Sequence, residues 1–192
     1  MIAAIVLAAG QSRRMGRNKL LLPYGTSTVI ETIVTEIAAC PQVGDLVVVT
    51  GHEHEQIAAQ LSRHPARCVF NPDYSRTDML ASIQTGLRAL SDEVTAALIA
   101  LGDQPRIRRE VVQQIVDAHR PGAVIIPSHN MKRGHPIVID RAWWPRILSL
   151  PPDGTLRDFT RTVEEQIRYV VVDDDSVLRD LDTPEDYAEM TG

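Results

Sequence analysis

The chain has 192 residues, of which 44% are hydrophobic, and its formal net charge is -5 at pH 7. This length predicts one domain over residues 1–192, and the negative charge argues against general binding to nucleic acid or to an anionic membrane. No apolar stretch reaches the roughly 20 residues of a membrane span, and the first apolar run precedes the basic residues, the reverse of a signal peptide. The two cysteines, Cys40 and Cys68, are far apart and favour a reducing compartment. We therefore predict a cytoplasmic location.

Short apolar runs alternate with amphipathic segments along the chain. The predicted strands are Ile2–Leu7, Leu46–Thr50, Cys68–Phe70, Ala96–Leu101, Ala123–Ile126, Pro136–Ile139 and Arg168–Val172. The predicted helices, with apolar residues every three or four positions, are Thr28–Ala39, Glu53–Ser62, Met79–Leu90 and Arg109–His119. This alternation predicts an α/β fold with a mostly parallel sheet between helices. Ligands of such sheets bind beyond the carboxyl ends of the strands, so the loops there are the candidate site.

The first of these loops is unusually basic. Residues 7–19 read LAAGQSRRMGRNK and hold two glycines, Gly10 and Gly16, together with four cations. Glycines at a strand exit let backbone N–H groups approach an anion, and the cations can balance a triphosphate. Five residues separate the glycines and Leu20 follows Lys19, so the loop is not a Walker A motif. The alternative, a solvated basic turn, is disfavoured because glycine placement, charge and position after the first strand coincide.

A second loop, GDQP, follows the predicted buried strand that ends at Leu101. Its carboxylate, Asp103, is expected at the carboxyl edge of the sheet. Protein sites for Mg²⁺ use one or two carboxylates with phosphate oxygens and water. The same four residues also favour a simple turn. Because the basic loop is expected at the same edge of the sheet, we interpret Asp103 as a Mg²⁺ ligand.

The pattern LAAGxSxRMGxxK, with GDQP, RGHPIVID at 133–140 and DLDTPEDY at 180–187, resembles the molybdenum cofactor cytidylyltransferase-like family of nucleotidyltransferases. The resemblance covers nearly the full chain. It implies a single three-layer αβα domain with a Rossmann-like sheet of the nucleotide-diphospho-sugar transferase type. It also favours CTP over GTP, because the chain has LAAG where a guanylyl branch would have LAGG.

The resemblance assigns roles to particular residues. Those implied to bind the nucleotide are Leu7, Ala8, Ala9, Gly10, Arg14, Lys19, Asn71 and Ser82. Those implied to be catalytic are Lys19, Arg14 and Asp103, and those implied to bind the acceptor are Gly134 and His135. Asp182 matches an acidic motif of the family as a second metal ligand, yet the sequence that follows it, Thr183 and Pro184, is equally typical of a helix cap.

Residues 78–81 depart from the family pattern, which leaves the base and the acceptor open. Asp78 is more simply a helix cap, with Leu80, Ile83 and Leu87 on the core face of that helix.

Two further pairs have structural interpretations. His52 and His54 lack further metal ligands nearby and are expected on a solvated face. Trp143 and Trp144 are expected to pack a small helix on the sheet.

These features predict a Mg²⁺-dependent enzyme that transfers CMP from CTP to molybdopterin and releases pyrophosphate. One alternative uses GTP or another triphosphate, or another phosphorylated acceptor such as a sugar phosphate. A different class of function is a non-catalytic protein that carries the molybdenum cofactor to a client. The resemblance implies a molybdenum hydroxylase as the client protein.

Overall fold

The computed structural model describes residues 1–75 and 79–191. The strands are β1 (Ile2–Ala8), β2 (Pro23–Tyr24), β3 (Ser27–Thr28), β4 (Val43–Thr50), β5 (Arg67–Phe70), β6 (Ala96–Leu101), β7 (Val124–His129), β8 (Lys132–Arg133), β9 (Ile137–Asp140) and β10 (Ile167–Val171). The α-helices are α1 (Val29–Ala38), α2 (His54–Gln60), α3 (Met79–Ala89), α4 (Arg109–Asp117), α5 (Trp144–Leu148), α6 (Leu156–Thr162) and α7 (Pro184–Thr191). Short 3-10 turns lie at Lys19–Leu21, Arg141–Trp143, Glu164–Gln166 and Asp175–Leu178.

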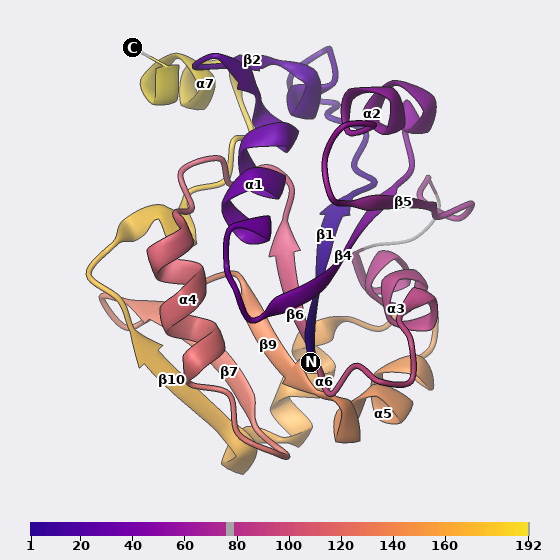
Figure 1. The fold of residues 1–192 in the computed structure, drawn as a ribbon, viewed down its shortest axis with the longest axis vertical. Helices are drawn as coiled ribbons and strands as arrows, with labels where there is room; N and C mark the ends of the chain where they lie inside the picture. Colours follow the sequence, from indigo (N-terminus) through magenta and orange to yellow (C-terminus); the bar gives the residue numbers. More distant parts are fainter. Residues whose placement is uncertain (76–78, 192) are drawn as a thin grey trace.

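In the described part of the chain, eight strands form one sheet in the order β10-β7-β9-β6-β1-β4-β5, with β8 paired to β7. The pairs β1–β4, β1–β6, β4–β5 and β7–β10 are parallel, whereas β9 is antiparallel to both β6 and β7. In the register, Leu7 of β1 lies opposite Leu101 of β6, and Ala8 lies opposite Thr50 of β4. The carboxyl ends of these three strands are therefore level, and the loops that follow them emerge at one edge of the sheet (Figure 1).

Helices cover both faces of the sheet, as predicted. Buried residues of α1, α2 and α4 form one core with Ala4 and Val6 of β1. Those of α3, α5 and α6 form a second core with Ala3 and Ile5 of the same strand. Successive side chains of a strand point to opposite faces, so β1 contributes to both cores. The predicted three-layer αβα arrangement is confirmed.

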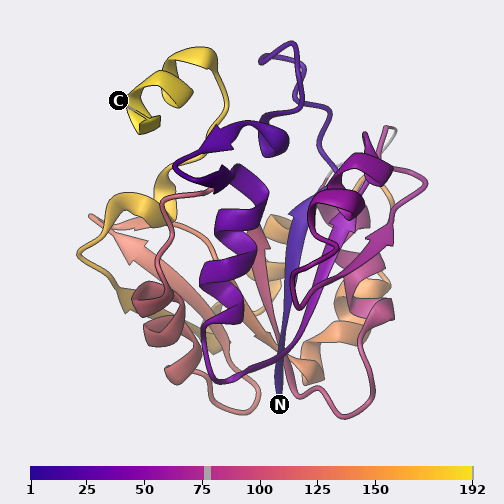
Figure 2. The same cartoon turned by 45° about the horizontal axis from the view of Figure 1, so that its top comes forward.

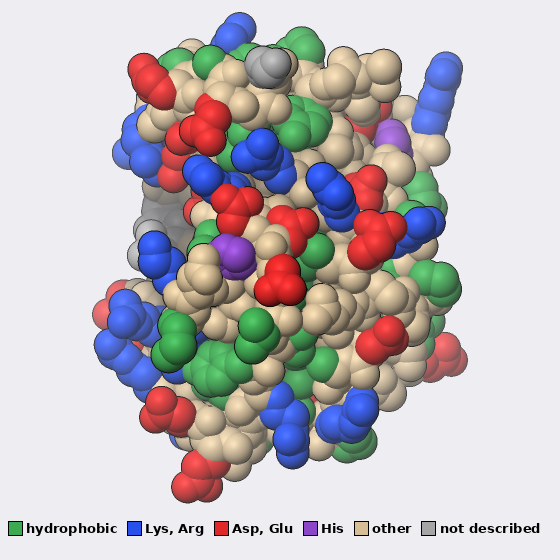
Figure 3. Space-filling model, turned by 90° about the vertical axis from the view of Figure 1, so that its left-hand side faces the viewer, with side chains coloured by type: hydrophobic (Ala, Val, Ile, Leu, Met, Phe, Trp, Pro, Cys, Tyr) green, Lys and Arg blue, Asp and Glu red, His purple; other side chains and the backbone are tan. Residues whose placement is uncertain are grey.

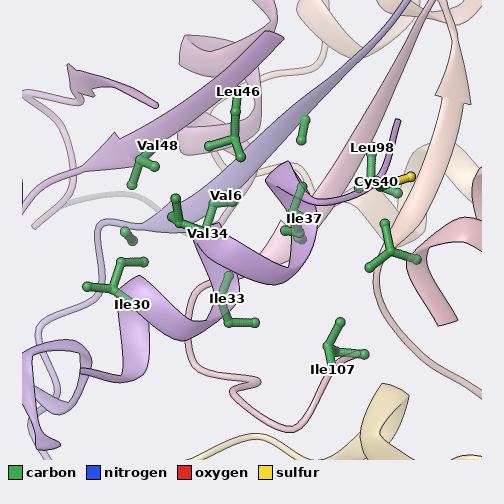
Figure 4. Close-up of a cluster of buried hydrophobic side chains, with 14 of the residues drawn as sticks. Val6, Ile30, Ile33, Val34, Ile37, Cys40, Leu46, Val48, Leu98 and Ile107 are labelled. Carbon is green, nitrogen blue, oxygen red and sulfur yellow. The ribbon is translucent and has the colours of Figure 1, made fainter. Parts of the chain in front are cut away.

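The first core is centred on α1. Val34 of α1 lies beside Val6 of β1, and Leu46 and Val48 of β4 lie on the same side of the sheet (Figure 4). Val34 and Val6 are fully buried. The apolar residues of α1 recur at positions 30, 33, 34 and 37, so one stripe of the helix faces the sheet.

Element boundaries agree with the predicted ones to within about three residues, and the expected packing role of the tryptophans is confirmed. Trp144 belongs to α5, is buried in the second core, and Trp143 packs against that core. Leu80, Ile83 and Leu87 are the buried face of α3. The predicted cap, Asp78, lies outside the described residues. None of the helices in the described part of the chain is both long and apolar enough to cross a membrane.

Charges of both signs are interspersed on the side of the molecule drawn in Figure 3. The local charge of the opening loop therefore matters more than a broad surface field on that side.

A capping box begins α1 and gives the fold a pH dependence. Thr28 and Glu31 each bond the backbone N–H of the other, and Ser27 Oγ donates to the same Glu31 carboxylate at 2.9 Å. Burial raises the pKa of Glu31, but hydrogen bonds from Gln60, Thr28, Ser27 and His64 outweigh burial and hold that pKa at about 2. Because the folded-state pKa is depressed, the charged carboxylate stabilises the fold above pH 4.5, its ordinary value, and this contribution is lost as the pH falls toward 2.

We expect Glu31→Gln to lower the free energy of unfolding at pH 6 and to lower it progressively less as the pH falls through 4.5. Urea unfolding at several pH values measures this difference. The control is Glu55→Gln, which changes an exposed glutamate in the first turn of α2. A difference between wild type and Glu31→Gln that does not change with pH would contradict the expectation.

Candidate active site

A cleft of about 660 Å³ lies at the carboxyl edge of the sheet. The strand β1 runs toward this edge from the bottom of Figure 1. The walls of the cleft come from the opening loop, the start of α3, the GDQP loop and the segment before α7. The view of Figure 2 brings this edge forward. The lining residues include Leu7, Ala8, Ala9, Gly10, Arg14, Lys19, Ser82, Asp103 and Asp182, all of them predicted from the sequence.

The opening loop is held by its own backbone and short polar side chains. Ser12 and Gly16 both have positive φ, at 48° and 67°. Ser12 Oγ accepts from the backbone N–H of Lys19 at 3.1 Å, and Asn18 caps the next turn by accepting from Leu20 N at 3.0 Å. A Cβ at Gly10 would meet nothing within 4 Å, so the strand exit is open to a ligand. These contacts fix the backbone from which Lys19 reaches the cleft.

Lys19 lies between two carboxylates in the cleft. Its Nζ is 2.5 Å from Asp103 Oδ2 and 2.8 Å from Asp182 Oδ1. Arg14 contacts the other oxygen of Asp182, also at 2.8 Å. The Lys19 and Asp103 side chains are only 13% and 20% exposed. Two cations and two carboxylates predicted from distant motifs thus form one network.

The network shifts the ionisation of its members. Burial lowers the pKa of Lys19, but the charges and hydrogen bonds of Asp103 and Asp182 outweigh burial, and the pKa is raised above 10.5. Burial raises the pKa of Asp182, but Lys19 and Arg14 outweigh it and lower that pKa below 3.8. Both residues therefore carry full charge at neutral pH.

The residue that caps α7 is Thr183 and not Asp182. Thr183 Oγ1 accepts from Asp186 N at 3.2 Å, and the Asp186 carboxylate accepts from Thr183 N at 2.8 Å, so Thr183 caps α7. The buried Leu181 donates its backbone N–H to Asp103 O at 2.8 Å. This bond holds the segment against the GDQP loop and leaves the Asp182 side chain facing Lys19.

Asp180 is a cleft residue that the sequence analysis missed. Buried Gln104 of GDQP donates from Nε2 to Asp180 Oδ1 at 2.7 Å. Burial and the neighbouring charge of Asp103 raise the pKa of Asp180. Its alternation with Asp182 in DLD, across the apolar Leu181, was the available signal.

The two predicted nucleotide residues beyond the loop have different positions. Ser82 lines the cleft, whereas Asn71 is 2% exposed and is absent from the cleft wall. Asn71 Nδ2 donates to Ser82 Oγ at 3.0 Å, and Asn71 Oδ1 accepts from Asp73 N at 3.0 Å. Asn71 therefore contacts the cleft wall through Ser82, and its donation occupies a lone pair of that hydroxyl.

Gly134 and His135, the predicted acceptor residues, are not among the residues that line the cleft. A Cβ at Gly134 would be 2.3 Å from the Val177 carbonyl oxygen, and His135 N donates to that oxygen at 2.9 Å. Burial lowers the pKa of His135 and outweighs the opposite effect of Asp103. Close packing accounts for the glycine, and the imidazole is neutral at pH 7 beside the Asp103 end of the site.

An aromatic cluster borders the other end of the cleft. Tyr74 lines the cleft, and its ring lies 6.1 Å from Phe70 and 6.4 Å from His52, between centroids. His54 contacts Phe70 at 5.2 Å and bonds the Thr50 hydroxyl through Nδ1 at 2.5 Å. Both imidazoles thus have partners within this cluster. Tyr74, like Asp180, was missed by the sequence analysis.

The two carboxylates are suited to a divalent cation that takes its other ligands from a phosphate and from water. Within residues 1–75 and 79–191, no group of three or more His, Cys, Asp and Glu side chains could hold a metal ion. Asp103 Oδ2 and Asp182 Oδ1 nevertheless converge on one cationic atom, Lys19 Nζ. Two carboxylates, with phosphate oxygens and water supplying the other ligands, match the usual binding of Mg²⁺.

A basic loop beside two convergent carboxylates at a sheet edge can bind a nucleoside triphosphate together with its metal ion. Residues 4–168 match the MobA-like NTP transferase domain, and the chain belongs to this family. Asp180 and Asp182 lie beyond the matched residues.

Relatives of nearly the same length have several activities in their names. The chain is 31% identical to a nicotine blue oxidoreductase from Paenarthrobacter nicotinovorans, over 96% of this chain and 93% of that protein. It is 28% identical to the molybdenum cofactor cytidylyltransferase of Escherichia coli, over 97% and 93%. It is 25% identical to a probable molybdenum cofactor guanylyltransferase of Trichormus variabilis, over 100% and 91%.

Solved structures share the fold. A nucleotidyl transferase from Methanothermobacter thermautotroptrophicus has a TM-score of 0.87 at 27% identity, covering 100% of this chain and 96% of that one. Rv0371c from Mycobacterium tuberculosis has a TM-score of 0.83 at 25% identity, covering 99% and 96%. The chain is thus a nucleotidyltransferase with the fold of the nucleotide-diphospho-sugar transferases, as predicted.

The Asn71–Ser82 hydrogen bond generates a testable expectation. Asn71→Asp keeps the acceptor for Asp73 N but cannot donate to Ser82, whose hydroxyl would then turn toward the new carboxylate. We expect Asn71→Asp and Ser82→Ala each to weaken nucleoside triphosphate binding about 10-fold, the effect of one net hydrogen bond. Isothermal titration measures the two dissociation constants.

The double variant distinguishes action through Ser82 from an independent contact. If Asn71 acts through Ser82, the double variant binds no more weakly than Ser82→Ala. Effects of the two substitutions that simply multiply would contradict this arrangement. Ser149→Ala, at the carboxyl end of α5, is the control for loss of a hydroxyl away from the cleft.

Proposed function

We propose that the protein transfers CMP from CTP to molybdopterin, in a Mg²⁺-dependent reaction that releases pyrophosphate. The observation that carries the proposal is the placement of Lys19 and Arg14 against Asp103 and Asp182, in a cleft bordered by the opening loop. Cations for a triphosphate and carboxylates for its metal ion are thereby within one network. CTP is favoured by the LAAG sequence and by the cytidylyltransferase relative.

The residues of the chain support each part of the transfer. Lys19 and Arg14 would bind the triphosphate. The negative charges of the phosphates would then replace the two carboxylates as the partners of these two cations. An oxygen of the acceptor's phosphate attacks the α-phosphorus, a new P–O bond forms, and the bond between the α-phosphorus and the bridging oxygen breaks, so pyrophosphate leaves. Lys19 would stabilise the charge that develops on these phosphates, and alignment in the cleft supplies much of the remaining acceleration.

Asp103 and Asp182 are the residues that would hold Mg²⁺. When bound, Mg²⁺ neutralises phosphate charge and acts as a Lewis acid at the reacting group. Asp180, with its raised pKa, borders the same end of the cleft and is held by Gln104. Neutral His135 and the closely packed Gly134 do not line the cleft, and they stay the predicted acceptor residues because His135 lies near Asp103.

Other substrates and another chemistry compete with this proposal. GTP is the competing nucleotide, because a guanylyltransferase is also among the relatives, and a sugar phosphate is an alternative acceptor. The oxidoreductase relative raises redox chemistry as a second candidate. The Lys19 and carboxylate network favours phosphate chemistry. A role as a cofactor carrier, delivery to a molybdenum hydroxylase and the cytoplasmic location stay predictions.

Pyrophosphate release tests the proposal. The purified protein is incubated with Mg²⁺ and molybdopterin, and with CTP, GTP, ATP or UTP in separate reactions. We expect turnover with CTP, and a loss of about 100-fold or more in kcat for Lys19→Met and for Asp103→Asn, as when one charge-stabilising group is removed. Matched controls are Lys132→Met on the exposed β8 strand and Asp153→Asn in an exposed turn.

The outcomes separate the candidates. Turnover with GTP alone would overturn the cytidylyl assignment, and turnover only with a sugar phosphate would overturn the acceptor. Binding of molybdopterin without pyrophosphate release, and indifferent to Asp103→Asn, would indicate a carrier. Reduction of nicotine blue with no nucleotide transfer would indicate an oxidoreductase.

A further inference from the structure

The position between the two carboxylates is filled by a cation of the chain itself, the ammonium group of Lys19. Lys19 Nζ is 2.5 Å from Asp103 Oδ2 and 2.8 Å from Asp182 Oδ1, which leaves no room between them for a second ion. Arg14 contacts Asp182 Oδ2 at 2.8 Å. A divalent ion that used both carboxylates would therefore have to replace the ammonium group.

We propose that Lys19 closes the metal site until a triphosphate draws its ammonium group away, so that the protein binds a divalent cation strongly only together with the nucleotide. The proposal rests on the proposed function, because it takes Asp103 and Asp182 as metal ligands and Lys19 as a phosphate ligand. It adds an order of assembly: the metal ion alone binds weakly, and the triphosphate makes its site available.

The local structure permits the side chain to move while the loop stays in place. The Lys19 backbone N–H is bonded to Ser12 Oγ, and Asn18 caps the turn that begins at Lys19. The lysine side chain beyond this anchor is a flexible four-carbon stem. Lys19 lines the cleft with Gly10 and Arg14, so rotation of this stem is enough to exchange the carboxylates for a phosphate.

Binding of the metal ion and binding of the triphosphate are coupled through the charge of Lys19. Full charge on the ammonium group beside the carboxylates repels an incoming cation, and its partial burial reduces screening by water. A triphosphate removes that repulsion by pairing with Lys19 and adds phosphate oxygens as ligands. By linkage, a metal ion at the carboxylates must strengthen triphosphate binding by the same factor.

Binding of Mn²⁺ without nucleotide tests the proposal directly. The free Mn²⁺ signal in electron paramagnetic resonance gives the dissociation constant for the full chain and for its variants. We expect Lys19→Met to bind Mn²⁺ at least 10-fold more tightly than wild type, and Lys19→Arg, which keeps the charge, to bind as weakly as wild type. Lys19→Gln, which removes the charge but keeps a polar side chain, repeats the test if Lys19→Met does not fold.

Two controls assign the effect to this site. Arg13→Met removes a charge from the same cleft wall, but Arg13 bonds Gln11 rather than a carboxylate, so no such gain is expected. Adding Asp103→Asn to Lys19→Met should abolish the gain, because one of the two ligands is then neutral.

Equal Mn²⁺ affinities for wild type and both uncharged variants would overturn the proposal. An equal gain in Arg13→Met would also overturn it, since a general change in cleft charge would then explain the result. The measurement needs neither nucleotide nor turnover. Failure of the proposed transfer reaction, with the expected Mn²⁺ affinities observed, would refute the reaction and not the closure of the carboxylate site.

Discussion

The ion pairs of Lys19 with Asp103 and Asp182 join three parts of the chain that are far apart in sequence. Lys19 follows β1, Asp103 follows β6, and Asp182 precedes α7. Partial burial makes each charge dependent on the others, because an unpaired charge here would lose hydration without compensation. The opening loop, the GDQP loop and the C-terminal segment are thereby held around one cleft. In both Lys19 and Asp182 these pairs outweigh the effect of burial on the pKa.

The sheet makes this meeting of charges possible. The level carboxyl ends of β1 and β6 bring the opening loop and GDQP together at one edge of the sheet. Two apolar cores, one on each face, fix the strands beneath them. The chemistry thus lies on short loops anchored in a rigid scaffold, which gives precise placement where the backbone is bonded and freedom where only a side chain must turn.

Much of this could be predicted from the sequence because the signals are local. Continuous apolar runs identify buried strands, and three- and four-residue spacing identifies α1 to α4. The antiparallel direction of β9 could not be predicted from its own residues, because a short apolar run does not show which way the strand points in the sheet. The connection between β7 and β9 held the answer, because it is too short for the helical crossover that parallel neighbours need.

The site was predictable where a residue acts through its own charge, as with Lys19 and Asp103. Sequence patterns do not reveal contacts that depend on a partner distant in the chain. Asn71 reaches the cleft only through Ser82, and Asp180 is positioned by Gln104. The backbone N–H of His135 donates to the Val177 carbonyl oxygen, and no spacing in the sequence reveals this contact.

The bond between Arg14 and Asp182 spans 168 positions of the chain. During synthesis the opening loop emerges from the ribosome well before Asp182, because the two are so far apart along the chain. Contacts between residues so far apart in sequence form late, because the entropic cost of closing the loop must first be offset by the formation of the core. A nascent chain can therefore build β1, β4 and β6 while Lys19 of the opening loop still lacks one of its two carboxylate partners, Asp182. The charge network at the sheet edge is then complete only after the segment that carries Asp182 has been synthesised.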